Sequence, residues 1–338
     1  MVTTWRLPIL TLSLFVLASY ATAQSYSITD LGIFSGGTVS QGNAVNVLGD
    51  VAGYARLANG DDHGSLWSER TGLLDLGSIP PETDFSVGEG LNSLGDVVGY
   101  SDYNGLQAQY AVMWNRNGLK NLGTLPGGRE SRANGINDLE QVAGYSDSAS
   151  AEAHAILWAP QSGMEDLGTL PGGYYSQGIA INVVSQIVGY SNAADGQWHA
   201  FVWTKESGMQ ALPGLPSEVG ASGNGINDQG EIVGGNGNDA VLWHNDQTHT
   251  VENLGTLPGQ GWATAFGIND NGQVVGWSGF TAFMWTSKNG MQDLNSLIPH
   301  GSGWELSLAS AINVRGQITG QGTIHSEQHG FLLTPISK

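Results

Sequence analysis

The chain has 338 residues, of which 30 are acidic and 11 are basic, so its formal net charge is −19 at neutral pH. A charge of that sign repels nucleic acid and anionic membrane surfaces, and it leaves cations or neutral molecules such as glycans as the expected partners. The sequence contains no cysteine, which excludes disulfides, thiolate metal sites and a cysteine nucleophile.

The first 23 residues predict a targeting segment that is not part of the fold. A short stretch ending at Arg6 precedes an apolar run from Leu7 to Leu17, and Ala21-Thr22-Ala23 fits the small-residue pattern that signal peptidase cleaves. The apolar run is too short for a transmembrane span. We therefore expect cleavage before Gln24 and a mature protein, residues 24–338, that is secreted or periplasmic and has no membrane span.

The rest of the chain repeats a unit of about 45 residues seven times. Self-similarity at a period between about 20 and 50 residues is typical of repeat architectures. In every copy an asparagine is followed seven residues later by a glycine. The pairs are Asn46/Gly53, Asn92/Gly99, Asn137/Gly144, Asn182/Gly189, Asn227/Gly234, Asn269/Gly276 and Asn313/Gly320.

Each unit predicts four short strands. The first ends at the asparagine and carries small residues two and four positions before it, as at Gly90 and Gly88, which period-two alternation assigns to one face. The second carries a β-branched residue two positions before the glycine, as at Val97. The third resembles "HAFVW" at 199–203, and the fourth contains "DLG" or a relative. Proline and glycine then lead to the next unit, as in "TLPGG" at 124–128.

Six of the seven third strands end in tryptophan. A large aromatic residue required in nearly every unit is expected to pack between neighbouring units, where it buries much area. These residues are Trp67, Trp114, Trp158, Trp203, Trp243 and Trp285.

Seven units of four antiparallel strands predict a single-domain, all-β fold, a seven-bladed β-propeller. The mature chain starts with a fourth strand, "YSITDLG" at 26–32, and ends with a third strand, "HGFLL" at 329–333. Pairing these two strands would complete one blade and close the ring. A β-solenoid or a two-sheet arrangement is the alternative, but a solenoid needs polar capping repeats that the sequence does not show.

The repeated phrases also carry a family resemblance. "DLGTLPGG" at 166–173, "GINDNGQVVGWS" at 267–278 and "HAFVW" at 199–203 resemble the HAF repeat of predicted bacterial extracellular proteins. The resemblance covers essentially the whole mature chain, although "LGIFSGG" at 31–37 and "LPGLPSE" at 212–218 depart from the pattern. It implies an exported bacterial protein and assigns no activity to any residue.

Metal sites are weakly indicated. His63, His154, His199 and His329 share one position in four copies, so a propeller would spread them around the ring, and we expect each to bond to a neighbouring loop. The acidic segments at 58–63 and 191–197 are the better calcium candidates, with solvated surface loops as the preferred interpretation. No cofactor is otherwise indicated.

The predicted ligand-binding residues lie in the connections from fourth to first strands, which should gather at one mouth of the central channel. They are the residues there that do not repeat between copies. The aromatic members are Tyr174, Tyr175, Trp262 and Trp304, and the charged members are Glu82, Asp84, Arg129, Glu130, Arg132, Glu218, His300 and Glu305.

A mouth of this composition favours a binding module, monomeric, for a glycan, a cell-envelope component or an extracellular protein. One alternative is a polysaccharide hydrolase or lyase that uses pairs of these loop carboxylates. The other is a purely structural extracellular protein. The sequence shows no serine-centred elbow, phosphate-binding loop or zinc-protease motif, and an enzyme is therefore the less favoured interpretation.

Overall fold

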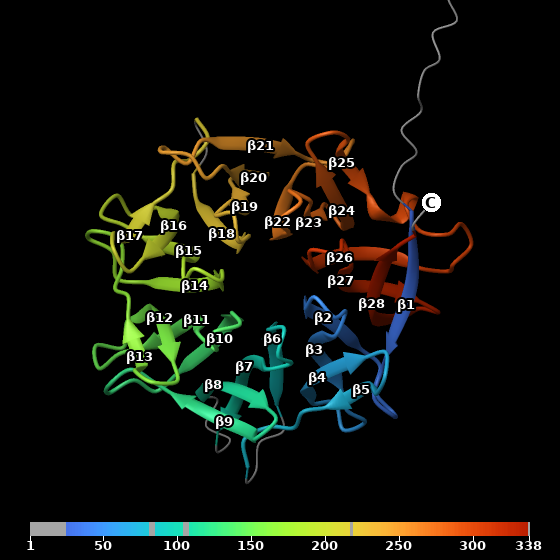
Figure 1. Ribbon diagram of the computed structural model, residues 1–338, viewed down its shortest axis with the longest axis horizontal. Helices are drawn as coiled ribbons and strands as arrows, with labels where there is room; N and C mark the ends of the chain where they lie inside the picture. The colour runs from blue at the N-terminus through green and yellow to red at the C-terminus, as the bar shows by residue number, and fades with distance from the viewer. Residues whose placement is uncertain (1–24, 81–84, 104–107, 217–218, 337–338) are drawn as a thin grey trace, which may run out of the picture.

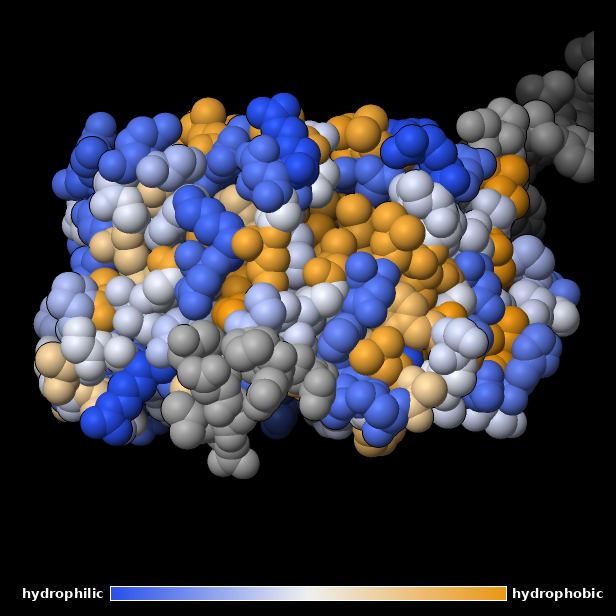
Figure 2. Space-filling model, turned by 90° about the horizontal axis from the view of Figure 1, so that it is seen from below, coloured by the Kyte–Doolittle hydropathy of each residue, from blue (hydrophilic) through white to orange (hydrophobic). Residues whose placement is uncertain are grey.

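The computed structural model describes residues 25–80, 85–103, 108–216 and 219–336. In this part of the chain, 28 strands form seven four-stranded antiparallel sheets, which are arranged as blades around a central axis (Figure 1). The prediction of a seven-bladed β-propeller is thus confirmed. Viewed from the rim, the molecule is a flat disc on which apolar areas alternate with polar ones (Figure 2). No helix within the described ranges is long and apolar enough to cross a membrane.

The strands of each blade run outward from the axis in chain order, except in the seventh. Blade 1 consists of β2 (Ser40–Val45), β3 (Val51–Arg56), β4 (Asp62–Ser68) and β5 (Gly72–Asp75). Blade 2 consists of β6 (Ser86–Leu91), β7 (Val97–Tyr103), β8 (Ala108–Asn115) and β9 (Gly118–Gly123). Blade 3 consists of β10 (Ser131–Ile136), β11 (Val142–Asp147), β12 (Ala153–Ala159) and β13 (Gly163–Asp166). Blade 4 consists of β14 (Ser176–Ile181), β15 (Ile187–Asn192), β16 (Trp198–Thr204) and β17 (Gly208–Ala211). Blades 5 and 6 are β18 (Ala221–Ile226), β19 (Ile232–Asn236), β20 (Asp239–Trp243), β21 (Val251–Gly255) and β22 (Ala263–Ile268), β23 (Val274–Ser278), β24 (Thr281–Thr286), β25 (Gly290–Asp293). Blade 7 is β26 (Glu305–Ile312), β27 (Ile318–Ile324), β28 (Glu327–Pro335) and β1 (Tyr26–Gly32), and one 3₁₀ turn, η1 (Leu294–Ser296), precedes it.

The seventh blade joins the two ends of the chain. Strand β1 pairs antiparallel with β28, so that Tyr26 lies opposite Pro335 and Asp30 opposite Phe331. In Figure 1 the blue first strand accordingly forms the outer edge of a red blade. This pairing closes the ring as the sequence predicts, and it covers the edge of β28 that would otherwise expose unpaired backbone groups.

The repeated asparagines form a closed ring of hydrogen bonds around the lower end of the channel. Each is buried, and its Nδ2 donates to the backbone carbonyl of the asparagine in the next blade, as from Asn137 to Asn182 at 3.0 Å. Six further bonds repeat the pattern, and the last runs from Asn313 back to Asn46 at 2.8 Å. The Oδ1 atom meanwhile accepts from the backbone N–H four residues later, as from Gln141 at 3.0 Å. One side chain thus shapes its own turn and holds the next blade.

Every innermost strand carries a β-bulge three residues before the asparagine. In blade 2, Gly88 lies opposite Gly99 and Gly90 opposite Val98, so that Glu89 is the extra residue. A bulge re-aims the side chains on either side of it. An added Cβ on Gly88 would lie 2.9 Å from the carbonyl oxygen of Gly53 in blade 1, whereas one on Gly90 would lie 3.0 Å from that of Asn134 in blade 3. The prediction that the two small residues share one face is therefore wrong.

The tryptophans of the third strands pack between blades, as predicted. Trp203 in blade 4 belongs to a buried cluster with Ala143 and Leu157 of blade 3. Trp114 lies against Gly64 of the preceding blade, where an added Cβ would come within 3.2 Å of the indole. Five of the six are buried and Trp67 is half-buried. Packing of this kind holds adjacent blades together farther from the axis than the asparagine ring.

Replacing Trp203 by alanine is expected to lower the free energy of unfolding by about 3 to 5 kcal/mol, because it opens a cavity between blades 3 and 4. Trp198 lies on the same strand with 41% of its surface exposed, and its replacement is the matched control, expected to cost less than about 1 kcal/mol. Urea denaturation measures both. Equal losses would show that the third-strand tryptophan does not carry the packing between blades.

Deleting residues 26–32 removes β1 and exposes the full edge of β28. We expect a large fall in melting temperature and aggregation, because a long unpaired edge recruits other chains. A chain that begins at Ser25 retains β1 and is the control. An unchanged melting temperature in the deletion variant would refute the role of β1 in closing the ring.

Candidate functional site

One end of the blades, here called the upper face, carries the connections from fourth to first strands and the turns from second to third strands. On this face, four aromatic residues of blade 4 form a wall. The rings of Tyr175 and Tyr190 stack with centroids 6.1 Å apart, and Trp198 packs edge-on against them at 5.4 and 5.5 Å. Tyr174, 61% exposed, completes the wall.

The aromatic wall borders a hollow of about 710 Å³ between blades 4 and 5. The other lining residues have small side chains or a hydroxyl, and they are Gly220, Ala221, Ser222, Gly235, Gly237 and Thr264. The wall and this floor, here called the aromatic hollow, form an apolar pocket edged by a few hydroxyl groups. Pockets of this kind are the usual binding sites for small organic ligands.

The hollow lies where the fifth copy of the repeat has glycine in place of an aromatic residue. The residue after the repeated glycine is Tyr54, Tyr100, Tyr145, Tyr190 or Trp277 in five blades, but Gly235 in blade 5 and Gln321 in blade 7. If Gly235 carried a Cβ atom, its nearest neighbour would be Thr264 Oγ1 at 3.4 Å, an ordinary van der Waals distance, so there is room for a side chain here. Of the residues that line the hollow, Tyr174 and Tyr175 were predicted from the sequence, whereas Tyr190, Trp198 and Gly235 were not. The sequence signal for the hollow was the glycine at position 235, where five other copies of the repeat have tyrosine or tryptophan.

The other two predicted aromatics lie apart from this hollow. Trp262, half-buried in blade 6, packs against Trp277 with ring centroids 4.7 Å apart and against the exposed Phe280 at 5.9 Å. Trp304 is half-buried against Phe331 and His329 in blade 7, where it packs on the hydrophobic core. The four unrepeated aromatics therefore do not form one platform, and Trp304 contributes to packing.

The predicted charged residues are also distributed. Arg132 lines the channel. Arg129 and Glu130 are exposed on the upper face, where Asp147 Oδ1 accepts both of their backbone N–H groups, at 2.6 and 2.7 Å. Glu305 is exposed at the start of β26. His300 borders a hollow with Tyr26 and Ile336, beside the outermost strand of blade 7 rather than the channel. Glu82, Asp84 and Glu218 lie outside the described residues.

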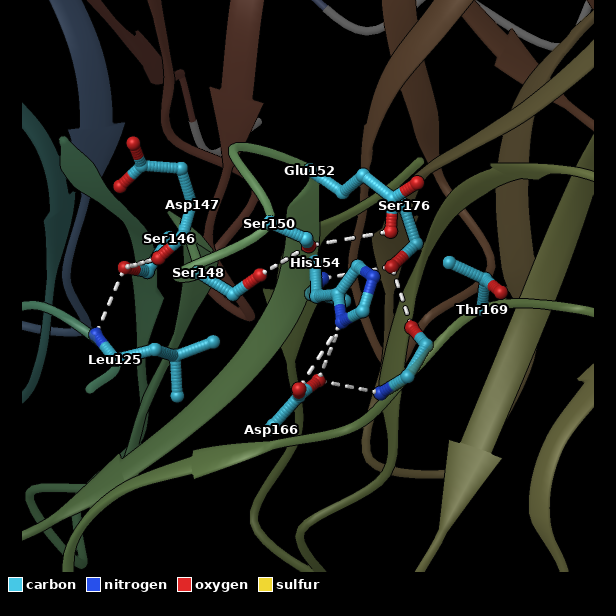
Figure 3. A network of polar contacts seen from close by, with 12 residues as sticks. Leu125, Ser146, Asp147, Ser148, Ser150, Glu152, His154, Asp166, Thr169 and Ser176 are labelled. Atoms are coloured by element: carbon cyan, nitrogen blue, oxygen red, sulfur yellow. Dashed lines mark hydrogen bonds and ion pairs between the residues drawn. The ribbon is translucent and has the colours of Figure 1, made fainter. Parts of the chain in front are cut away.

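The repeated histidines bond within their own blades. His154 Nδ1 lies 3.0 Å from both carboxylate oxygens of Asp166 at the end of the neighbouring strand β13 (Figure 3). His63 pairs with Asp75 and His329 with Asp30 in the same way, both at 2.9 Å. His199 instead contacts Asp195 in the preceding loop, at 2.9 Å. The expected loop partner is thus found for His199, whereas an aspartate of the fourth strand is the partner in the other three.

The candidate calcium loops have their carboxylates engaged by protein groups. Asp62 forms a two-point ion pair with Arg56, at 2.8 and 3.1 Å, and Asp61 accepts from Asn59 at 2.6 Å. In the other loop, Asp195 bonds to His199. Within the described ranges, no three histidine, aspartate or glutamate side chains are grouped closely enough to hold a metal ion.

The central channel, about 600 Å³, is the second candidate site. It is lined by the seven innermost strands, and the residue at each bulge lies on its wall. These residues are Asn43, Glu89, Asn134, Ile179, Asn224, Phe266 and Ser310. The bulge residue is asparagine in three blades and differs in each of the other four, so the symmetric backbone carries an asymmetric lining.

Glu89 is the only carboxylate among the residues that line the described channel. Asn43 Nδ2 lies 3.2 Å from its Oε2. Burial between the channel walls raises the pKa of Glu89 from its ordinary 4.5 to about 7, and the positive charge of Arg132 opposes that rise. Glu89 was not predicted from the sequence, because the bulge that turns it toward the channel has no sequence signature.

Arg132, in the adjacent blade, lies over the ring of Tyr100 with its Cζ 4.1 Å from the ring centroid. Its Nε is buried and has no hydrogen-bond partner among the described residues. Burial is the main cause that raises the pKa of Tyr100 to about 12, and Glu89 adds to the rise. Stacking on an aromatic face stabilises a guanidinium without using its hydrogen-bond donors.

Glu89→Gln is expected to stabilise the fold at pH 8 by about 1 to 3 kcal/mol, since one unit of pKa shift corresponds to about 1.4 kcal/mol. The folded state favours protonated Glu89, so the native chain loses stability as the pH rises from 4.5 to about 7. At pH 4.5 the folded state is protonated and the unfolded state is already half protonated, so the variant should gain little. Melting temperatures at pH 4.5 and 8 test this, with the exposed Glu305→Gln as control. An equal effect at both pH values would contradict the assignment.

No family model matches the sequence, and no curated protein matches it either. Solved structures do match its fold. Oligogalacturonate lyase in complex with manganese aligns with a TM-score of 0.55 at 10% identity, over 92% of this chain and 93% of that one. The extracellular domain of a candidate one-component system from B. thetaiotaomicron gives 0.52 at 10% identity, over 93% of this chain and 40% of that one. Virginiamycin B lyase from Staphylococcus aureus gives 0.48 at 12% identity, over 92% and 100%. At this identity the likeness to the first two structures shows the fold alone, that of a β-propeller.

Proposed function

We propose that the protein is a binding module that recognises a neutral glycan in the aromatic hollow between blades 4 and 5. The observation that carries the proposal is the wall formed by Tyr174, Tyr175, Tyr190 and Trp198 opposite a floor of small residues. Aromatic faces pack well against the apolar faces of sugar rings, and rigid tyrosine and tryptophan side chains lose little entropy on binding.

The polar groups of the hollow suit a ligand rich in hydroxyls. Tyr190 Oη donates to Gln177 Oε1 at 2.6 Å, which fixes the ring, and Ser222 and Thr264 place hydroxyls on the floor. No acidic or basic side chain lines the hollow within the described residues. A protein of net charge −19 would also repel an anionic polysaccharide. These features together favour a neutral sugar.

Binding is favoured over hydrolysis by the placement of the carboxylates. A glycosidase of the usual kind needs two carboxyl groups about 5 to 10 Å apart. Among the described residues, the channel lining includes one carboxylate, that of Glu89, and the lining of the hollow includes no carboxylate. The segment before Gln24 predicts that the protein binds its ligand outside the cytoplasm.

Gly235→Tyr tests the hollow by restoring the aromatic residue that other blades carry. The free space around Gly235 should admit the ring, which would fill the floor and weaken glycan binding by at least about tenfold, or about 1.4 kcal/mol. An array of neutral oligosaccharides identifies the ligand, and calorimetry measures its affinity.

Gln321→Tyr is the matched control, because it restores the same residue in blade 7, away from the hollow. Its affinity should stay within about twofold of the native protein, a difference of about 0.4 kcal/mol. Undiminished binding in Gly235→Tyr would move the site elsewhere. A native protein that binds no glycan on the array would refute the proposed function.

A further inference from the structure

The central channel contains an acid and a base that are close in the fold but not paired with one another. Glu89 stands at the bulge of β6 and Arg132 on the adjacent strand β10, and both side chains line the same space. In Figure 1 these two strands lie next to each other at the inner edge of blades 2 and 3.

Within the described part of the chain, neither Glu89 nor Arg132 forms an ion pair. Among the described residues, Arg132 forms no ion pair with Glu89, and its Nε is buried without a hydrogen-bond partner while its guanidinium stacks on Tyr100. The one hydrogen bond that Glu89 accepts from a described residue comes from the amide of Asn43, at 3.2 Å. Charges removed from bulk water are normally paired, because leaving them alone costs several kcal/mol. The two side chains therefore present a carboxyl group and a guanidinium group to the channel with hydrogen-bonding capacity that the described residues do not use.

The rest of the channel limits what that ligand is. Ile179, Phe266 and Leu308 bring apolar side chains to the lining from blades 4, 6 and 7. Ser310 adds a buried hydroxyl without a partner among the described residues. The volume, about 600 Å³, lies in the usual range for small-molecule sites. The channel is thus charged on one side and largely apolar on the other.

We propose that the channel binds a small zwitterion, an α-amino acid with an apolar side chain. Its ammonium group pairs with the carboxylate of Glu89, its carboxylate pairs with the guanidinium of Arg132, and its side chain lies against Ile179, Phe266 and Leu308. A lone metal cation is opposed by Arg132, and a lone anion is opposed by Glu89. A ligand that carries both charges satisfies both residues at once.

The affinity should depend on pH in a direction set by Glu89. Only the ionised carboxylate pairs with an ammonium group, and burial raises the pKa of Glu89 to about 7. Binding should therefore weaken as the pH falls from 8 to 6, over which a free amino acid keeps both charges. The glycan proposed for the hollow is neutral and should show no such change.

The test is calorimetric titration of the full chain with L-leucine at pH 8, compared with N-acetyl-L-leucine and L-leucinamide, which lack one charge each. We expect L-leucine to bind at least about tenfold more tightly than either, or about 1.4 kcal/mol. Glu89→Gln should abolish the discrimination against N-acetyl-L-leucine, and Arg132→Gln should abolish that against L-leucinamide. These ratios report on the site even where a variant changes the stability of the fold.

Matched controls carry the same substitutions outside the channel. Glu305→Gln and Arg129→Gln alter exposed residues of the upper face and should leave all three affinities unchanged. Gly235→Tyr should retain leucine binding, because Gly235 lines the hollow and not the channel. Failure of glycan binding in the hollow and failure of leucine binding in the channel can therefore be told apart. Equal binding of L-leucine and its two analogues would overturn the inference. A dissociation constant for L-leucine weaker than about 10 mM, which corresponds to a binding free energy of only about 2.7 kcal/mol, would also overturn it. A neutral sugar that displaces L-leucine with comparable affinity would overturn it as well.

Discussion

The ring of seven asparagine amides is the interaction on which the rest of the molecule depends. Each amide holds its own turn through Oδ1 and the next blade through Nδ2, so the shape of a turn and the spacing of blades are set together. A buried amide left without partners would cost about 1 to 3 kcal/mol, and here every member depends on both of its neighbours. The ring fixes the lower ends of the innermost strands and thus the height at which each bulge faces the channel.

The fold could be predicted because its determinants recur in the sequence. The spacing from asparagine to glycine, the tryptophan of the third strand and the terminal half-blades each indicate one feature, and the structure contains all of them. The bulge could not be predicted, since it requires neither glycine nor proline, and Asn43, Glu89 and Phe266 all occupy it. Strict alternation therefore placed Gly88 and Gly90 on one face, although they contact different blades.

The candidate sites were predicted less completely for a related reason. Tyr174 and Tyr175 were recognisable as aromatics that do not repeat, but the space beside them depends on a side chain that is missing at Gly235. An absence is hard to read from one sequence unless the repeats are aligned at that position. Trp304 also does not repeat, yet it is half-buried against Phe331, because side-chain direction and not only position along the chain decides exposure.

The closed seventh blade has a consequence for how the chain folds. Strand β1 is synthesised first, yet its partner β28 lies some three hundred residues later, and the bond from Asn313 to Asn46 also joins the two ends. Closing a loop of that length costs about 5 kcal/mol of chain entropy, which only the finished ring offsets. The last blade can therefore assemble only after β28 has been synthesised. A chain terminated before β28 would retain β1 without its partner strand, which distinguishes it from a chain that includes β28 for any factor that recognises exposed strands.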